Sequence, residues 1–342
     1  MLREPLTKAE VKAAIERTGC ERVPVMMHKW WGDGLAALHG DALERMAARF
    51  PDDICMVWHQ MPGGQTSPTD NPHFRFGYLD DYSAAERHSI GQSVVLLDDW
   101  ADLDRFLADF PNPDEPGVFD GAARAAREQA NGRYLLGSFW SVFHERLWGI
   151  RGMENLMLDY YDEMDGLKRI GRALLDFHKV TIDRYAALGC DGIFTSDDLG
   201  HQTGPMMSPA IFEELYLPLY AELIAHAHAK GLHVFLHSCG DNTPLMPMLI
   251  EAGLDVFHPV QKGCMDMAGT ARRFGRDMSF LAGMDVQHTL PNGSVAQVRE
   301  EVRAMRALFH TPDGGLLLAA GNGIMPGTPL ENIEAMLEEM CR

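Results

Sequence analysis

Residues 192–261 read GIFTSDDLGHQTGPMMSPAIFEELYLPLYAELIAHAHAKGLHVFLHSCGDNTPLMPMLIEAGLDVFHPVQ, and this stretch decides the fold. It holds three short apolar runs, at 192–195, 233–236 and 256–258, separated by two longer segments with helical spacing of apolar residues. Short strands that alternate with helices are typical of a parallel sheet whose neighbouring strands are joined by crossover helices. The stretch therefore predicts a strand–helix–strand–helix–strand unit.

The same alternation extends over the whole chain and gives eight apolar runs. The predicted strands are 23–27, 54–57, 134–139, 192–195, 233–236, 256–258, 279–282 and 316–319. The predicted helices between them include 38–49, 121–130, 153–188, 209–230, 244–252, 295–309 and 329–340. Eight strands are the number that a closed (β/α)8 barrel of the TIM type requires. We therefore predict an α/β protein with one barrel domain over residues 1–342.

Two segments lie outside this regular pattern. Residues 1–20 are polar and amphipathic, so we expect an N-terminal helix and no secretory signal. The segment 59–116, after the second strand, is too long for a simple crossover and is rich in glycine, proline, aspartate and aromatic residues. We predict that it is an insertion carrying functional loops.

Composition limits the classes of partner. The chain has 49 acidic and 30 basic side chains and a formal charge of −19, which disfavours binding to nucleic acid or to anionic membranes. No apolar run approaches the roughly 18 residues of a membrane-spanning helix, so we expect a cytoplasmic protein. Its six cysteines are few and irregularly placed, and we expect free thiols.

Polar and aromatic residues follow the predicted strands, at the end of a barrel where active sites form. Candidates for catalytic roles as acid, metal ligand or substrate anchor are His28, His144, Glu145, Asp197 and Asp198. Candidates for contact with a small-molecule substrate are Trp30, Trp31, Trp58, Trp140, Gln202, Gln261 and Asn322. Loops are polar in any fold, and tryptophans also pack in cores, so these residues are hypotheses for the site.

The sequence 197–261 resembles the uroporphyrinogen decarboxylase superfamily, as does GTPLENIEAM at 327–336. The resemblance continues at lower density through GIRGMENLMLDYYD and LAGMDVQHTLP. It implies a (β/α)8 barrel with its chemistry around His237 to Gly240. The superfamily contains metal-free porphyrinogen decarboxylases and zinc-dependent methyltransferases that serve corrinoid proteins or thiols.

The segment after the first strand separates these two groups. Decarboxylases resemble one another in a motif of the form MRQAGRY, whose arginines hold substrate carboxylates. Here the corresponding sequence is RVPVMMHKWWGDG, residues 22–34, with His28 and Trp31 or their neighbours in place of those arginines. A tetrapyrrole with eight carboxylates would lose much of its charge pairing at such a site. The resemblance is therefore closer to the methyltransferase group.

The methyltransferases of the superfamily have a His-x-Cys motif after the fifth strand, which His237 and Cys239 match. Imidazole and thiolate are a pair suited to Zn²⁺. The relatives complete the site with a cysteine near the C-terminal Gly-x-Gly, where this chain has Asn322. We expect Asp198, at the end of the fourth strand, to supply the third ligand. Cys264 and His258 are further candidates.

The resemblance implies a zinc-dependent enzyme that moves a methyl group from a methoxy-aromatic or methylamine-type compound to a corrinoid protein. Two alternatives stay open. One is a decarboxylase that acts on a tetrapyrrole or a smaller acid, and the other is a barrel that binds a tetrapyrrole or corrinoid without turnover. Decarboxylases of the family include homodimers, so the resemblance also allows a homodimer.

Overall fold

The computed structural model of the chain describes residues 3–59, 95–108, 110–129 and 131–342. Its centre is a parallel sheet of eight strands in the order β1-β10-β9-β8-β7-β4-β3-β2. The strands are β1 (Val25–Met26), β2 (Ile54–Trp58), β3 (Tyr134–Ser138), β4 (Gly192–Ser196), β7 (His233–His237), β8 (Val256–His258), β9 (Ser279–Met284) and β10 (Leu316–Ala320). The sheet curls into a nearly closed barrel, and the amide of Asp53 bonds the carbonyl of Val25 at 2.9 Å between its two edge strands. The predicted (β/α)8 barrel is confirmed.

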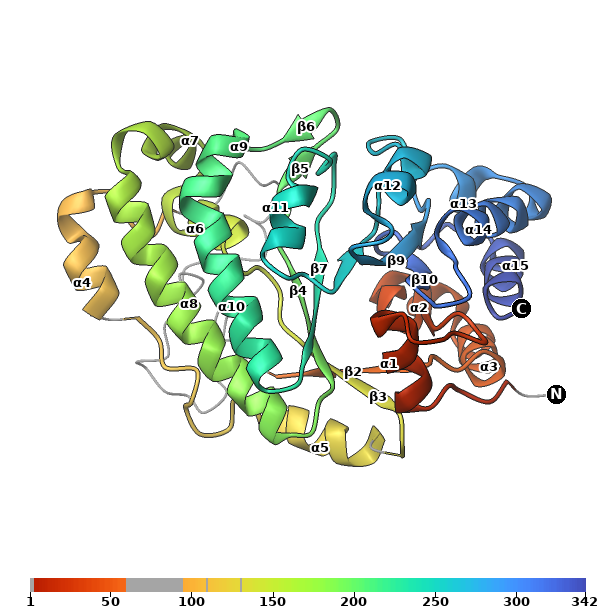
Figure 1. Cartoon of the computed structure of the whole chain (residues 1–342). Coiled ribbons are helices and arrows are strands. Elements are labelled where there is room, and N and C mark those ends of the chain that lie inside the picture. The colour runs from red at the N-terminus through yellow and green to blue at the C-terminus, as the bar shows by residue number, and fades with distance from the viewer. Residues whose placement is uncertain (1–2, 60–94, 109, 130) are drawn as a thin grey trace.

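Helices surround this sheet, and α8 and α10 lie side by side along one flank (Figure 1). The longer helices are α1 (Lys8–Glu16), α2 (Asp33–His39), α3 (Asp41–Arg49), α5 (Asp120–Gln129), α6 (His144–Arg151), α7 (Met153–Asp162), α8 (Met164–Ala187), α10 (Leu217–Ala229), α12 (Met267–Phe274), α14 (Val295–Phe309) and α15 (Leu330–Met340). Shorter elements are η1 (His28–Trp30), η2 (Trp100–Asp102), α4 (Leu103–Ala108), the hairpin β5 (Gly200–His201) and β6 (Gly204–Pro205), α9 (Pro209–Ile211), η3 (Phe212–Tyr216), α11 (Met246–Glu251) and α13 (Thr289–Asn292).

The strands form because both of their faces are apolar. Every residue of β3, β4, β9 and β10 is buried, as expected for strands enclosed by helices on one side and by the barrel interior on the other. Aromatic rings fill part of the interior, where Phe194 of β4 packs on Phe235 of β7 with ring centres 6.0 Å apart. The predicted N-terminal helix is α1, which contacts β3 and β10 and pairs Lys8 and Lys12 with Asp191, ahead of β4.

Two predicted helices differ from the structure. The segment 153–188 forms α7 and α8, because Glu163 between them leaves helical geometry with φ −137° and ψ 35°. The segment 209–230 contains the π-helical turn η3 between α9 and α10. Helix α6 is absent from the predicted helices. Its first turn is stabilised by Asp197, which is distant in the sequence.

The predicted insertion lies largely outside the described residues, at 60–94. Its remainder contains η2 and α4, and the Nε1 of Trp100 donates to Asp159 of α7 at 3.0 Å. An insertion over 59–116 therefore stays a prediction. Among the described helices, none is both long enough and apolar enough to cross a membrane.

Candidate metal centre

The carboxyl ends of β4, β7 and β8 bring three polar residues to one level of the barrel. The strand register pairs Ser196 with His237, and His237 with His258. Residues that alternate along a strand share a face, and both Phe235 and His237 pack on rings of the barrel interior. The imidazole of His237 is therefore directed toward the barrel mouth by its position at the end of β7.

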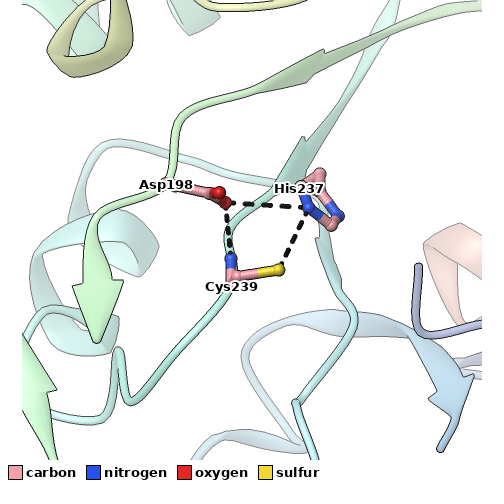
Figure 2. A group of neighbouring side chains, drawn as sticks. All are labelled: Asp198, His237 and Cys239. Atoms are coloured by element: carbon pink, nitrogen blue, oxygen red, sulfur yellow. Dashed lines mark hydrogen bonds and ion pairs between the residues drawn. The ribbon is translucent and has the colours of Figure 1, made fainter. Parts of the chain in front are cut away.

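Three ligand groups meet beside this imidazole, as Figure 2 shows. The Nε2 of His237 lies 3.4 Å from the Sγ of Cys239 and 3.7 Å from the Oδ1 of Asp198. One ligand atom from each residue lies within 4.8 Å of the others. Tetrahedral zinc with ordinary bond lengths separates such ligands by about 3.4 to 3.6 Å. The two separations from His237 are close to these values. This group, called here the metal cluster, is therefore a candidate zinc site that leaves one of the four tetrahedral positions open.

The loop that carries Cys239 is fixed by its neighbours. The buried amide of Asn242 donates from Nδ2 to the carbonyls of Ser238, Cys239 and Gly240, at 3.2, 2.9 and 3.3 Å. Gly240 has φ 83°, and a Cβ there would overlap the backbone of Gly200. The glycine is thus required by both its backbone conformation and its packing. The backbone amide of Cys239 donates to Asp198 at 2.8 Å, which joins two ligands of the cluster.

His258 determines the tautomer of His237. The Nε2 of His258 lies 2.9 Å from the carbonyl of Ala320, which can only accept, so this nitrogen carries the proton. The Nδ1 of neutral His258 then accepts from the Nδ1 of His237 at 2.7 Å. The Nε2 of His237 is left with a free lone pair that faces Cys239 and Asp198. Metal-binding histidines are oriented in this way by a partner on their second nitrogen.

Asn322 contacts the thiol through its amide nitrogen. Its Nδ2 lies 3.5 Å from the Sγ of Cys239, and its Oδ1 accepts from the amide of Gly323 at 2.7 Å. Exchanging the two amide atoms would bring two donors together at Gly323, so this orientation is the favoured one. Asn322 therefore offers the sulfur a hydrogen bond rather than a ligand atom. A cavity of about 70 Å³ adjoins Cys239, with Asn322 and Gln261 in its wall.

The electrostatics of the cluster depend on burial. Burial lowers the pKa of His237 to about 4 and raises the pKa of Cys239 to about 12. Burial also holds the pKa of His258 well below its ordinary value. These histidines are thus neutral near pH 7, as a metal ligand and its orienting partner require, while the thiol needs a nearby cation to lose its proton.

The tryptophans line the approach to the cluster. Trp140 stacks on His237 with ring centres 5.8 Å apart, and buried Trp30 stacks on His258 at 4.6 Å. Trp58, whose relative exposure is 41%, lies 5.7 Å from Trp140. Three of the four predicted substrate-contact tryptophans therefore gather at this site.

Lys29 extends among these rings. Its Nζ lies 3.8 Å from the ring centre of Trp140 and 4.0 Å from that of Trp30. Burial lowers the pKa of Lys29 to about 7. Neither Lys29 nor Asn242 was among the residues predicted for the site. The sequence signal for Lys29 is its position at the end of an apolar strand, next to two tryptophans.

Two of the predicted catalytic residues, Asp197 and His144, are buried around the start of α6. The carboxylate of Asp197 accepts from the backbone amides of Phe143, His144 and Glu145 at 3.1, 2.8 and 2.7 Å, and from Tyr220 at 2.7 Å. Asp197 thus stabilises the start of α6. His144 is buried against the hydroxyls of two tyrosines, and burial lowers its pKa to about 3. The structure does not bring either side chain into the metal cluster, and their catalytic roles stay predictions.

Glu145 lies closer to the cluster. The Oγ of Ser196 donates to its carboxylate at 2.6 Å, and burial together with the nearby charges of Asp197 and Asp198 raises its pKa. A carboxyl group that stays protonated near neutral pH can donate a proton.

The remaining predicted residues lie at the edges of the site. The Nε2 of His28 bonds the carbonyl of Phe50 at 3.1 Å, and its ring packs on partly buried Trp31. Gln202 is exposed at the turn of the β5–β6 hairpin, and the Oε1 of Gln261 accepts from the amide of Gly240 at 2.7 Å. Of the two further metal candidates, both ring nitrogens of His258 have partners, and Cys264 is not part of the cluster.

Fold and cluster together define a (β/α)8 barrel with a candidate metal centre at the carboxyl ends of its strands. A family model described as uroporphyrinogen decarboxylase (URO-D) matches residues 97–342. The chain belongs to this family, as the sequence analysis predicted.

Two curated relatives and one solved structure are similar to the chain. A methylated-thiol–coenzyme M methyltransferase of Methanosarcina mazei is 26% identical over 186 residues, which cover 54% of this chain and 47% of the relative. The chain thus matches about half the length of that methyltransferase. A uroporphyrinogen decarboxylase of Anaeromyxobacter sp. is 27% identical over 245 residues, covering 70% and 67%. The structure of a methyltransferase from Methanosarcina mazei matches with TM-score 0.62 and 16% identity over 98% of both chains, which supports the fold.

Proposed function

We propose that this chain is a zinc-dependent methyltransferase that moves a methyl group from a small methylated compound to the corrinoid of a partner protein. The observation that carries the proposal is the metal cluster itself. Asp198, His237 and Cys239 present three ligand atoms at zinc spacing with an adjoining cavity. Similarity to a methyltransferase that acts on methylated thiols supports the same kind of reaction here.

The side chains of the cluster would hold the ion and prepare the reaction. When bound, zinc would act as a Lewis acid on the heteroatom that carries the methyl group and weaken its bond to carbon. His237 keeps its Nε2 lone pair available because its Nδ1–H donates a hydrogen bond to the Nδ1 of His258. The indoles of Trp30 and Trp140 exclude water from one side of the cluster. We propose that Glu145, whose pKa is raised by burial and by the charges of Asp197 and Asp198, gives its proton to the departing heteroatom.

The methyl acceptor comes from a second protein. Demethylation of an unactivated ether or amine needs a strong nucleophile, and the described side chains of the site include none strong enough to act alone. A reduced corrinoid would supply this nucleophile as the methyl acceptor, and the electrons of the broken bond would remain on the departing heteroatom. We propose that the corrinoid protein docks over the barrel mouth, with the segment 59–116 as a contact surface.

Two measurements test this function. Zinc content of the gently purified protein is compared with that of a His237→Ala, Cys239→Ser double variant, and we expect near-stoichiometric zinc that the variant lacks. Reduced cobalamin is then mixed with the zinc protein and a panel of methoxylated aromatics and methylamines, with cobalamin methylation followed by its absorption spectrum. Absence of zinc from both proteins after reconstitution, or absence of methyl transfer from every compound, would contradict the proposal.

A decarboxylase is the second candidate, favoured by the 27% identity to a uroporphyrinogen decarboxylase. It would act on a tetrapyrrole or a smaller acid without metal. Release of carbon dioxide from such a substrate by the zinc-free protein would identify it. Tight binding of a tetrapyrrole without any turnover would instead support a binding protein.

A further inference from the structure

Lys29 is held in a cradle of four aromatic rings. Its Nζ lies 4.0 Å from the ring centre of Trp30, 3.8 Å from Trp140, 5.4 Å from Trp58 and 5.5 Å from Phe194. The rings come from η1, the loop after β3, the end of β2 and β4, so four separate parts of the barrel converge on one ammonium group. Cation–π contacts on two indole faces fix a side chain that is otherwise long and flexible.

The charge of this ammonium group has no counterpart in the part of the chain that the structure describes. There, no carboxylate pairs with Lys29 and no acceptor receives a hydrogen bond from its Nζ. Other deeply buried cations differ, since the guanidinium of Arg151 pairs with Asp159 at 2.6 Å. Aromatic rings satisfy the charge only in part and leave the three N–H donors of an ammonium unused.

The cradle adjoins the metal cluster. Trp140 and Trp30, the two rings nearest to the ammonium, also pack on His237, with ring centres 5.8 and 6.0 Å away. The positive charge of Lys29 contributes to the lowered pKa of His237. Trp58 is partly exposed, so one wall of the cradle faces solvent. Lys29 and Trp58 also line a cavity of about 380 Å³, so the ammonium is open to a small ligand on that side.

We propose that Lys29 binds the negative charge of the methyl donor, so that the substrate is a small methylated compound with a carboxylate beside an apolar or aromatic body. The inference rests on the proposed function and narrows its substrate class. A carboxylate would accept the unused N–H donors, and the indoles would contact the apolar body. A methylammonium donor is disfavoured, because the aromatic cradle that would recognise it already contains a cation.

Three probes of matched shape test the charge preference: 4-methoxybenzoate, methoxybenzene and 4-methoxyphenyl-trimethylammonium. Their binding to the zinc-loaded protein is followed by fluorescence of the tryptophans in the cradle and by calorimetry. At pH 6, below the pKa of about 7 of Lys29, we expect the benzoate to bind at least about tenfold more tightly than methoxybenzene, as for one charge-assisted hydrogen bond in a partly buried site. Lys29→Met should abolish this ratio, and Lys29→Arg should retain part of it.

A matched lysine variant and a folding check serve as controls. Lys168→Met removes an exposed lysine that pairs with Glu214, and it should leave the ratio unchanged. Circular dichroism establishes whether each variant folds. If Lys29→Met does not fold, the binding ratios of Lys29→Arg and Lys29→Gln test the inference instead. The inference would be overturned by an unchanged ratio in Lys29→Met or by tightest binding of the ammonium probe. It would also be overturned if the three probes bind equally or if none binds. Charge-selective binding without methyl transfer to cobalamin would overturn the proposed function alone.

Discussion

Two neighbouring aspartates end β4 and have opposite roles. Asp197 is fully buried and accepts four hydrogen bonds, three of them from the start of α6. Asp198 is partly exposed, bonds one backbone amide and faces His237. The first belongs to a buried polar group with His144 and Tyr220, called here the α6 core, and the second to the metal cluster. The same residue type at adjacent positions thus serves stability in one case and a candidate chemical site in the other.

The largest expected effect is a difference in folding stability between the alanine variants of the two aspartates. Asp197→Ala leaves three backbone amides and the hydroxyl of Tyr220 without their acceptor, so the free energy of unfolding should fall by about 3 to 5 kcal/mol. Asp198→Ala removes one hydrogen bond at a partly exposed site and should cost about 1 kcal/mol in metal-free protein. Urea unfolding after chelation measures both, and equal losses would refute the division between the α6 core and the cluster.

The next largest effect is a loss of folding stability at acidic pH, which two buried histidines cause. His144 and His178 are fully buried, and burial lowers the pKa of each from 6.5 to about 3. Between pH 6.5 and pH 3 the unfolded chain therefore binds protons that the folded chain does not. Stability falls as pH falls through this window, by about 1.4 kcal/mol per pH unit for each histidine.

A variant isolates this contribution from that of the carboxyl groups. Because His178→Gln cannot titrate, the slope of its unfolding free energy against pH should be smaller by about 1.4 kcal/mol per unit. Denaturant unfolding at several pH values between 6 and 4.5 gives both slopes. Identical slopes for variant and parent would mean that His178 is charged in the folded protein.

Sequence patterns predicted the barrel because each of its strands is a local apolar run and each crossover has helical spacing. The family resemblance pointed to His237 and Cys239, and the end of the fourth strand pointed to Asp198. The structure brings the three side chains together, because the carboxyl ends of neighbouring parallel strands lie at the same end of the barrel. The first turn of α6 was not predictable from its own residues, because its cap is Asp197, more than fifty positions away. The cradle around Lys29 was missed for the same reason: its rings come from four separate segments.

The orienting role of His258 should appear as metal affinity. His258→Phe keeps a ring that can stack on Trp30 but removes the acceptor for the Nδ1 proton of His237. Loss of such a partner typically weakens metal binding by about 10- to 100-fold. Zinc competition titration measures this change, and nitrogen NMR of metal-free protein should show that His237 loses its single Nδ1-protonated tautomer. Unchanged affinity and tautomer would mean that His258 only packs.

The smallest effect distinguishes two roles for Asn322, which stands at the position where the family resemblance implies a cysteine ligand. The hydrogen bond from its Nδ2 lowers the pKa of Cys239, against the rise that burial causes, so it favours the thiolate without contacting the ion. Asn322→Ala should therefore weaken zinc binding by only about threefold, the size of one weak hydrogen bond. Cys239→Ser, which changes a proposed direct ligand, should weaken zinc binding far more in the same titration. Equal losses in the two variants would make Asn322 a ligand, and the open position of the cluster would then be filled by the protein.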